Sequence, residues 1–70
     1  MPETIELIIN GQPKQVSAGQ SIAALLQSLE LNPKQVAVEV NLDLIPREVH
    51  AEHVLSAGDR VEVVSLVGGG

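Results

Sequence analysis

One helical pattern stands among several strand-like patterns, and this constrains the fold more than any other feature of the chain. Four apolar residues spaced i, i+3, i+4 and i+7 form a single helical stripe: Ile22, Leu25, Leu26 and Leu29. Ser21 precedes the stripe and is a natural N-cap. Ala24 stands where a capping box would have Glu or Gln, so we expect this helix to depend on packing for its stability. We expect it to end near Glu30, before Asn32-Pro33.

A hairpin is predicted before the helix. Its first strand shows an alternation typical of one buried face, in which Ile5, Leu7 and Ile9 alternate with Glu6 and Ile8. Asn10-Gly11 follows and predicts a tight turn, because both central residues of such a turn need positive φ. The return strand is predicted over Gln12–Ser17. Pro13 cannot donate a ladder hydrogen bond, which favours an edge position for this strand.

Two further strands are predicted directly after the helix. In the first, Val36, Val38 and Val40 alternate with Ala37, Glu39 and Asn41, so the valines are predicted to point inward. Residues 41–43 are interpreted as a turn, and Leu44 and Ile45 as a short strand that ends at Pro46. Residues 47–55 are predicted to form a loop with one helical turn.

The last strand is predicted over residues 60–67, after the turn signal Ala57-Gly58-Asp59. Val61 and Val63 alternate there with Glu62, Val64 and Leu66. The order hairpin, helix, strand, short strand and last strand allows the first and last strands to pair in parallel at the sheet centre. We therefore predict an α+β fold of the β-grasp type, with a mixed sheet of four to five strands and one main helix on one face. Residues 1–66 are assigned to this domain and residues 67–70 to a flexible C-terminal glycine tail.

Composition excludes several classes of function. Seventy residues allow one small domain, and without Phe, Tyr or Trp its core must be aliphatic. The absence of cysteine excludes disulfides, thiolate metal sites and thiol nucleophiles. A net charge of -5 repels phosphate backbones and anionic membrane surfaces, so neither nucleic acid nor a membrane is an expected partner. With no signal-like segment and no apolar run of membrane length, we expect a cytoplasmic protein that is a monomer by itself.

The face of the sheet without a helix is a candidate docking surface. Ile8, Val64 and Leu66 point to this face if the alternation holds, and an apolar patch there would favour partner binding. For Ile8, an ordinary exposed aliphatic residue is an equally good interpretation. Glu62 neighbours Val64 and is a candidate to pair with an arginine of the partner.

Three consecutive glycines, Gly68, Gly69 and Gly70, follow the last strand pattern. Because glycine has no Cβ, such a tail fits a channel too narrow for any other residue. This favours a C-terminus that is itself the reactive group. The alternative is a remnant of a tag or linker, since glycine-rich ends are common in such segments.

Short motifs along nearly the whole chain occur in an order typical of one family. They are Asn10-Gly11, Ala18-Gly19-Gln20-Ser21-Ile22-Ala23-Ala24-Leu25-Leu26, Val38-Glu39-Val40-Asn41, Pro46-Arg47, Ala51 through Leu55 to Gly58-Asp59-Arg60-Val61-Glu62, and Val67-Gly68-Gly69-Gly70. Together they resemble the ThiS family of thiamine-pathway sulfur carriers, without a large gap. The sequence departs from the family pattern at His50, where an aromatic residue is often expected. This position is not part of the reactive tail.

The resemblance implies a carrier that is consumed and regenerated, not an enzyme, and that binds no cofactor itself. A ThiF-type adenylating enzyme would use Mg-ATP to join the carboxylate of Gly70 to AMP. A persulfide on a sulfur-donor protein would displace AMP and leave a C-terminal thiocarboxylate. A ThiG-type thiazole synthase would then accept the sulfur. In this scheme Gly68 and Gly69 would enter the partner's channel.

Two other functions remain open. One is a sulfur carrier of another pathway, such as the small subunit of molybdopterin synthase, whose relatives are usually longer and richer in Phe. The other is a ubiquitin-like modifier or binding module, whose tail forms an amide with a lysine or does not react.

Other candidate sites have weaker support. His50 and His53 are three residues apart, but two histidines without a third ligand predict packing or solvated roles and no metal site. Ser21 is interpreted as a cap and not as a nucleophile, because nothing places a histidine beside it. Asp59 and Arg60 are expected to shape the turn before the last strand.

Overall fold

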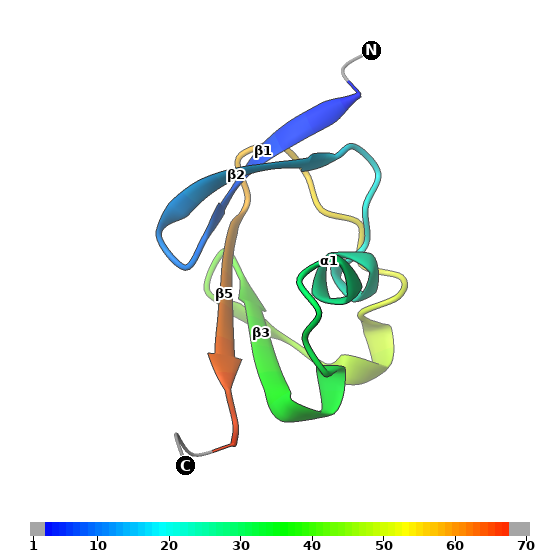
Figure 1. The fold of residues 1–70 in the computed structure, drawn as a ribbon, viewed down its shortest axis with the longest axis vertical. Coiled ribbons are helices and arrows are strands. Elements are labelled where there is room, and N and C mark those ends of the chain that lie inside the picture. The colour runs from blue at the N-terminus through cyan, green and yellow to red at the C-terminus, as the bar shows by residue number, and fades with distance from the viewer. Residues whose placement is uncertain (1–2, 68–70) are drawn as a thin grey trace.

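The computed structural model describes residues 3–67 and contains five strands, one α-helix and two short 3₁₀ helices (Figure 1). In chain order these elements are β1 (Thr4–Ile9), β2 (Gln12–Ser17), α1 (Ile22–Ser28), η1 (Pro33–Gln35), β3 (Val36–Val40), β4 (Asp43–Ile45), η2 (Arg47–Val49) and β5 (Arg60–Ser65). The predicted hairpin, helix and three later strands are therefore all present. In the described part of the chain, no helix has the length and apolar character needed to span a membrane.

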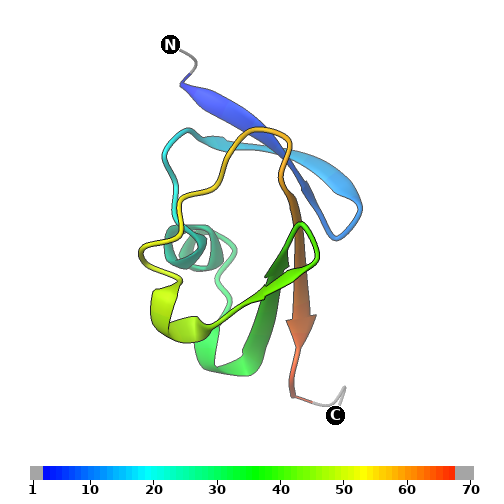
Figure 2. The same cartoon turned by 180° about the vertical axis from the view of Figure 1, so that it is seen from behind.

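The strands form one mixed sheet in the order β2-β1-β5-β3-β4. The first and last strands pair in parallel at its centre, with Ile8 opposite Arg60 and Ile9 opposite Val61, and the other pairs are antiparallel. β2, which contains Pro13, lies at an edge of the sheet, as predicted. The helix lies on one side of the sheet in both views (Figures 1 and 2), so the predicted β-grasp architecture is confirmed.

The core is aliphatic and lies between the helix and the sheet. Leu25 and Leu26 of the helical stripe are completely buried, and Leu29 packs against the core from its edge. The inward valines of β3 are buried as predicted, and the other buried apolar residues are Leu7, Ile9, Val16, Ile22, Leu55 and Val61. Removing these side chains from water is the main favourable contribution to folding in a chain of this size.

The helix begins at the predicted cap. The Oγ atom of Ser21 accepts a hydrogen bond from the backbone N–H of Ala24 at 3.1 Å. The helix ends at Ser28, slightly before the expected end near Glu30, because Glu30 adopts a positive φ of 60°. Such a conformation cannot continue a right-handed helix.

The last strand is shorter than predicted. β5 ends at Ser65, so Leu66 and Val67 lie beyond it, which corrects the predicted strand over residues 60–67. Ser65 is opposite Val36, the first residue of β3, and the strand pairing ends with these two residues. The next backbone N–H, that of Leu66, donates to the carbonyl oxygen of Gln35 in η1 at 2.8 Å.

The turn before β5 is held by two polar side chains. Nδ2 of Asn41 donates to Oδ1 of Asp59 at 3.0 Å, and Oδ1 of Asn41 accepts from the backbone N–H of Arg60 at 3.0 Å. The other carboxylate oxygen of Asp59 accepts from the backbone N–H of Ser56 at 2.9 Å. Asp59 therefore shapes this turn, as predicted, and the start of β5 is fixed relative to β3.

Candidate functional site

The predicted reactive residue Gly70 lies outside the described residues, as do Gly68 and Gly69. β5 is the strand that leads to these glycines. Two residues separate the end of β5 at Ser65 from the first of these glycines.

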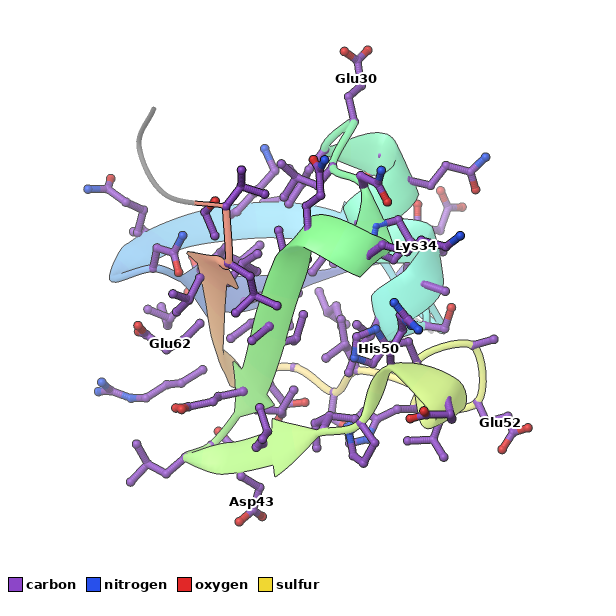
Figure 3. All side chains as sticks on the ribbon, turned by 90° about the horizontal axis from the view of Figure 1, so that it is seen from below. Glu30, Lys34, Asp43, His50, Glu52 and Glu62 are labelled. Atoms are coloured by element: carbon purple, nitrogen blue, oxygen red, sulfur yellow. The ribbon has the colours of Figure 1, made fainter. Side chains whose placement is uncertain are left out.

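β5 has one core face and one open face. Val61 is buried and Val63 packs against the core, whereas Arg60, Glu62 and Val64 are exposed. Figure 3 shows Glu62 projecting away from the side of the sheet on which the helix lies. The alternation expected for the last strand is therefore present along β5.

Exposed apolar side chains gather where β5 ends. Val64 is 52% exposed and Leu66 is 65% exposed, and the next residue, Val67, is 51% exposed. Val64 is opposite the half-buried Ala37 of β3. Isolated exposed aliphatic residues are ordinary, but a group of them on one surface is typical of a docking surface.

The structure separates Ile8 from the other predicted docking residues along the sheet. Ile8 is only partly exposed and is opposite Arg60, the first residue of β5. Val64 lies near the other end of the same strand. Ile8 and Val64 therefore do not form one local contact, and the apolar group next to the tail consists of Val64, Leu66 and Val67.

Two residues of the open face were not singled out from the sequence. Glu39 of β3 is opposite both Glu62 of β5 and Leu44 of β4, and Leu44 is 66% exposed. The alternation of residues 36–40 contained a signal for Glu39, since it places that side chain outward. Its proximity to Glu62 depends on strand register, which the pattern does not report.

Asn10, which the sequence predicts only as a turn former, also contacts β5. Its side-chain Oδ1 accepts a hydrogen bond from the backbone N–H of Val63 at 2.8 Å. Nδ2 of Asn10 donates to the carbonyl oxygen of Val63 at 3.3 Å. The hairpin turn is thus attached to β5 two residues before the strand ends.

A cleft of about 210 Å³ opens beside Leu66. Its lining includes Lys34 and Arg47, two of the four basic residues of the chain, together with Val36, Leu44 and Pro46. The surface near the tail therefore has a basic margin here and an acidic centre at Glu39 and Glu62. A partner that binds this surface needs the complementary pattern of charge.

The two histidines do not form a site together. His50 is buried, and its Nε2 lies 2.9 Å from the carbonyl oxygen of Ile45, whereas His53 is partly exposed. Figure 3 shows His50 in the interior between the helix and the loop that carries η2, which is a packing role. Among residues 3–67, no three His, Cys, Asp or Glu side chains come together as metal ligands would.

The sequence profile of the ThiS family matches residues 7–70, more than nine-tenths of the chain. The chain belongs to the ThiS family. The sulfur carrier protein ThiS of Escherichia coli is 30% identical over 66 residues, which cover 94% of this chain and 100% of that relative. The crystal structure of the thiamine biosynthesis protein ThiS from Geobacter metallireducens superimposes with a TM-score of 0.82 at 30% identity, covering 94% of this chain and 100% of that one.

Part of a larger protein also resembles this ThiS-family chain. A thiazole synthase of Paramagnetospirillum magneticum is 38% identical over 66 residues, which cover 94% of this chain. The chain spans only 20% of that synthase and, likewise, 20% of a thiazole synthase of Magnetococcus marinus.

Membership of the ThiS family confirms two predictions. The fold is the β-grasp fold of its structural relatives, and the chain is a sulfur carrier of thiamine biosynthesis. The relative from Escherichia coli is named a sulfur carrier protein, which agrees with the prediction of a carrier.

Proposed function

We propose that this ThiS-family chain carries sulfur as a thiocarboxylate on its terminal residue, Gly70. The observation that supports this most directly is the family match, which extends through residue 70 and so includes all three glycines. A tag or linker remnant would not be expected to match the family. β5 leads toward these glycines and ends five residues before Gly70.

The first step is adenylation by a ThiF-type enzyme that binds Mg-ATP. A C-terminal carboxylate is ionised at neutral pH, so an oxygen of the Gly70 carboxylate can attack the α-phosphorus of ATP. The bond from that phosphorus to the bridging oxygen breaks, and pyrophosphate leaves. The product is an acyl adenylate, a mixed anhydride whose carbonyl carbon is open to nucleophiles.

The second step places sulfur on the tail. The terminal sulfur of a persulfide on a donor protein attacks the acyl carbon, and AMP leaves. A second protein thiol then attacks the sulfur–sulfur bond, which yields a disulfide and frees the thiocarboxylate of Gly70. The chain has no cysteine, so both thiols belong to other proteins.

The sulfur acceptor in this proposal is a ThiG-type thiazole synthase. Support comes from the two thiazole synthases of which one fifth resembles this chain. A carrier segment within the same polypeptide as a synthase is consistent with direct transfer between the two domains.

The folded domain supplies the binding free energy for these reactions. Ordering three glycines in a narrow channel costs about 1 to 2 kcal/mol per residue in backbone entropy. Contacts of the open face must offset this cost. We assign them to Val64 and Leu66, with Glu62 as an ionic contact and Ile8 at the margin, and Gly68 and Gly69 occupy the channel.

The decisive experiment compares the wild-type chain with two tail variants, one lacking Gly70 and one with a single alanine added after it. Each is incubated with a purified ThiF-type enzyme and radiolabelled ATP, and pyrophosphate release and the acyl adenylate are measured. We expect both variants to keep the fold and to lose adenylation. Adenylation of either variant at the wild-type rate contradicts the proposal.

Mass spectrometry of the chain isolated from its host tests the second step. We expect a C-terminal peptide in which sulfur replaces one oxygen. Because oxidation of Met1 gives a similar nominal mass change, the change must be located to the tail peptide. Branched lysine peptides that end in the tail would indicate a protein modifier instead.

A further inference from the structure

The parallel ladder between β1 and β5 continues beyond β1 through a side chain. The backbone N–H of Ile8 donates to the carbonyl oxygen of Asp59 at 3.0 Å, and that of Asn10 donates to Val61 at 2.9 Å. The next rung, at Val63, is made by the side-chain amide of Asn10, which bonds both the N–H and the carbonyl of that residue at 2.8 and 3.3 Å. Every second residue from 59 to 63 is thus hydrogen-bonded to β1 or to Asn10, which follows it.

The amide replaces a peptide group that β1 does not provide. The chain reverses at Asn10 and Gly11, which have φ values of 50° and 80°, so the backbone of the hairpin turns away from β5. Figures 1 and 2 show β5 running on past the tip of this hairpin. A side-chain amide has a donor and an acceptor, as a peptide group does, and it can therefore occupy the vacant rung.

This rung is placed where β5 otherwise has a neighbour on one side only. On the β3 side, Val64 and Ser65 are opposite Ala37 and Val36. On the other side, the strand pairing of β1 with β5 stops at Val61. Without the amide of Asn10, the last four residues of β5 would be paired with β3 alone, and a two-stranded ribbon twists more strongly than a wider sheet.

We propose that Asn10 is a positioning residue for the sulfur-carrier reaction, because its amide fixes the direction in which β5 presents the tail. The inference rests on the proposed adenylation of Gly70. In adenylation, the terminal carboxylate must approach the α-phosphorus within a narrow range of distance and angle. A displacement of about 1 Å at a reacting group can reduce the rate about 100-fold.

The test uses two substitutions that preserve the turn. Asn10→Gly tolerates the positive φ but removes both side-chain hydrogen bonds. Asn10→Asp retains an oxygen that accepts from the N–H of Val63 but lacks the donor. The control is Asn41→Gly, since Asn41 also has a positive φ of 53° and two side-chain hydrogen bonds, but holds the start of β5.

Adenylation kinetics are measured at a temperature at which circular dichroism shows all four proteins folded. We expect kcat to fall at least about tenfold for Asn10→Gly and less for Asn10→Asp, with KM changed by less than about twofold. Asn41→Gly should leave kcat near the wild-type value. Amide exchange monitored by NMR should show lost protection at Val63 in Asn10→Gly, with Val61 still protected.

The outcomes separate the two proposals. If the wild-type chain itself is not adenylated, the proposed function fails. If it is adenylated and Asn10→Gly matches it in kcat, the positioning role is wrong. Equal losses of kcat in Asn10→Gly and Asn41→Gly would assign the effect to general destabilisation and would also overturn the inference.

Discussion

Glu39 and Glu62 are directly opposite each other on β3 and β5. Figure 3 shows Glu62 on the face of the sheet that the helix leaves open. Like charges in this relationship destabilise an antiparallel pair. Glu62 is two residues before the exposed Val64 on β5, and Glu39 is two residues after Ala37, which is opposite Val64. The acidic pair is therefore placed where the proposed adenylating enzyme would dock, and a basic side chain of that enzyme would relieve the repulsion.

Neutralising one member of this pair should stabilise the free chain. We expect Glu62→Gln to raise the free energy of unfolding by about 0.2 to 1 kcal/mol at low ionic strength. The gain should shrink as salt screens the repulsion. Urea denaturation at low and high salt measures both effects.

The matched control for this prediction is Glu52→Gln, since Glu52 is exposed in the loop after η2. An equal gain from the control would show that the effect reflects the overall net charge of -5 and not the cross-strand pair.

Introducing a charge at the apolar end of β5 should weaken partner binding. Val64 is 52% exposed, so we expect Val64→Asp to change the free energy of unfolding by less than about 1 kcal/mol. Loss of a hot-spot contact at the centre of an interface costs about 2 kcal/mol or more, and burying an unpaired charge adds to this, so we expect a corresponding rise in the Kd for the adenylating enzyme. Isothermal titration calorimetry gives this value directly.

Val54→Asp is the control, since Val54 is similarly exposed, at 56%, but belongs to the loop that bridges to Ser21 at the start of the helix. Wild-type affinity of Val64→Asp would reject the docking surface. So would equal weakening by the two variants.

The N-cap should contribute measurably, since the helix is only seven residues long and has no acidic residue in its first turn. Ser21→Ala removes the acceptor of the Ala24 N–H and should lower the free energy of unfolding by about 1 kcal/mol. Thermal unfolding of this variant should be compared with that of Ser17→Ala, whose serine is exposed at the end of β2. A similar loss in both variants would argue against a specific capping contribution.

Truncating a buried residue should have a much larger effect. Leu26 is completely buried, and Leu26→Ala should cost about 2 to 5 kcal/mol. Leu44→Ala, at a residue that is 66% exposed, should cost less than about 1 kcal/mol. Because small domains have a low total stability, we expect a substantial unfolded fraction of Leu26→Ala in native-state NMR spectra. A fully folded spectrum with an unchanged urea midpoint would contradict this core assignment.

The sequence by itself determined the elements whose cause is local. The alternation of apolar residues predicted the strands, because side chains of a strand point to opposite faces in turn. Asn10-Gly11 predicted the hairpin turn, because backbone sterics restrict which residues adopt positive φ. Ser21 predicted the helix cap, because its side chain bonds a backbone N–H only three residues further along the chain. The parallel pairing of β1 and β5 also followed from the order of the elements.

Only the tertiary structure decided the features that depend on which strands meet and in which register. β5 ends at Ser65 because β3 begins opposite it, and Glu39 meets Glu62 because of the same register. The amide of Asn10 bonds Val63, which is 53 residues away in the chain. Periodicity reports which face of an element is buried, but it contains no information on the partner across the sheet, and these contacts arise only when distant segments pack together.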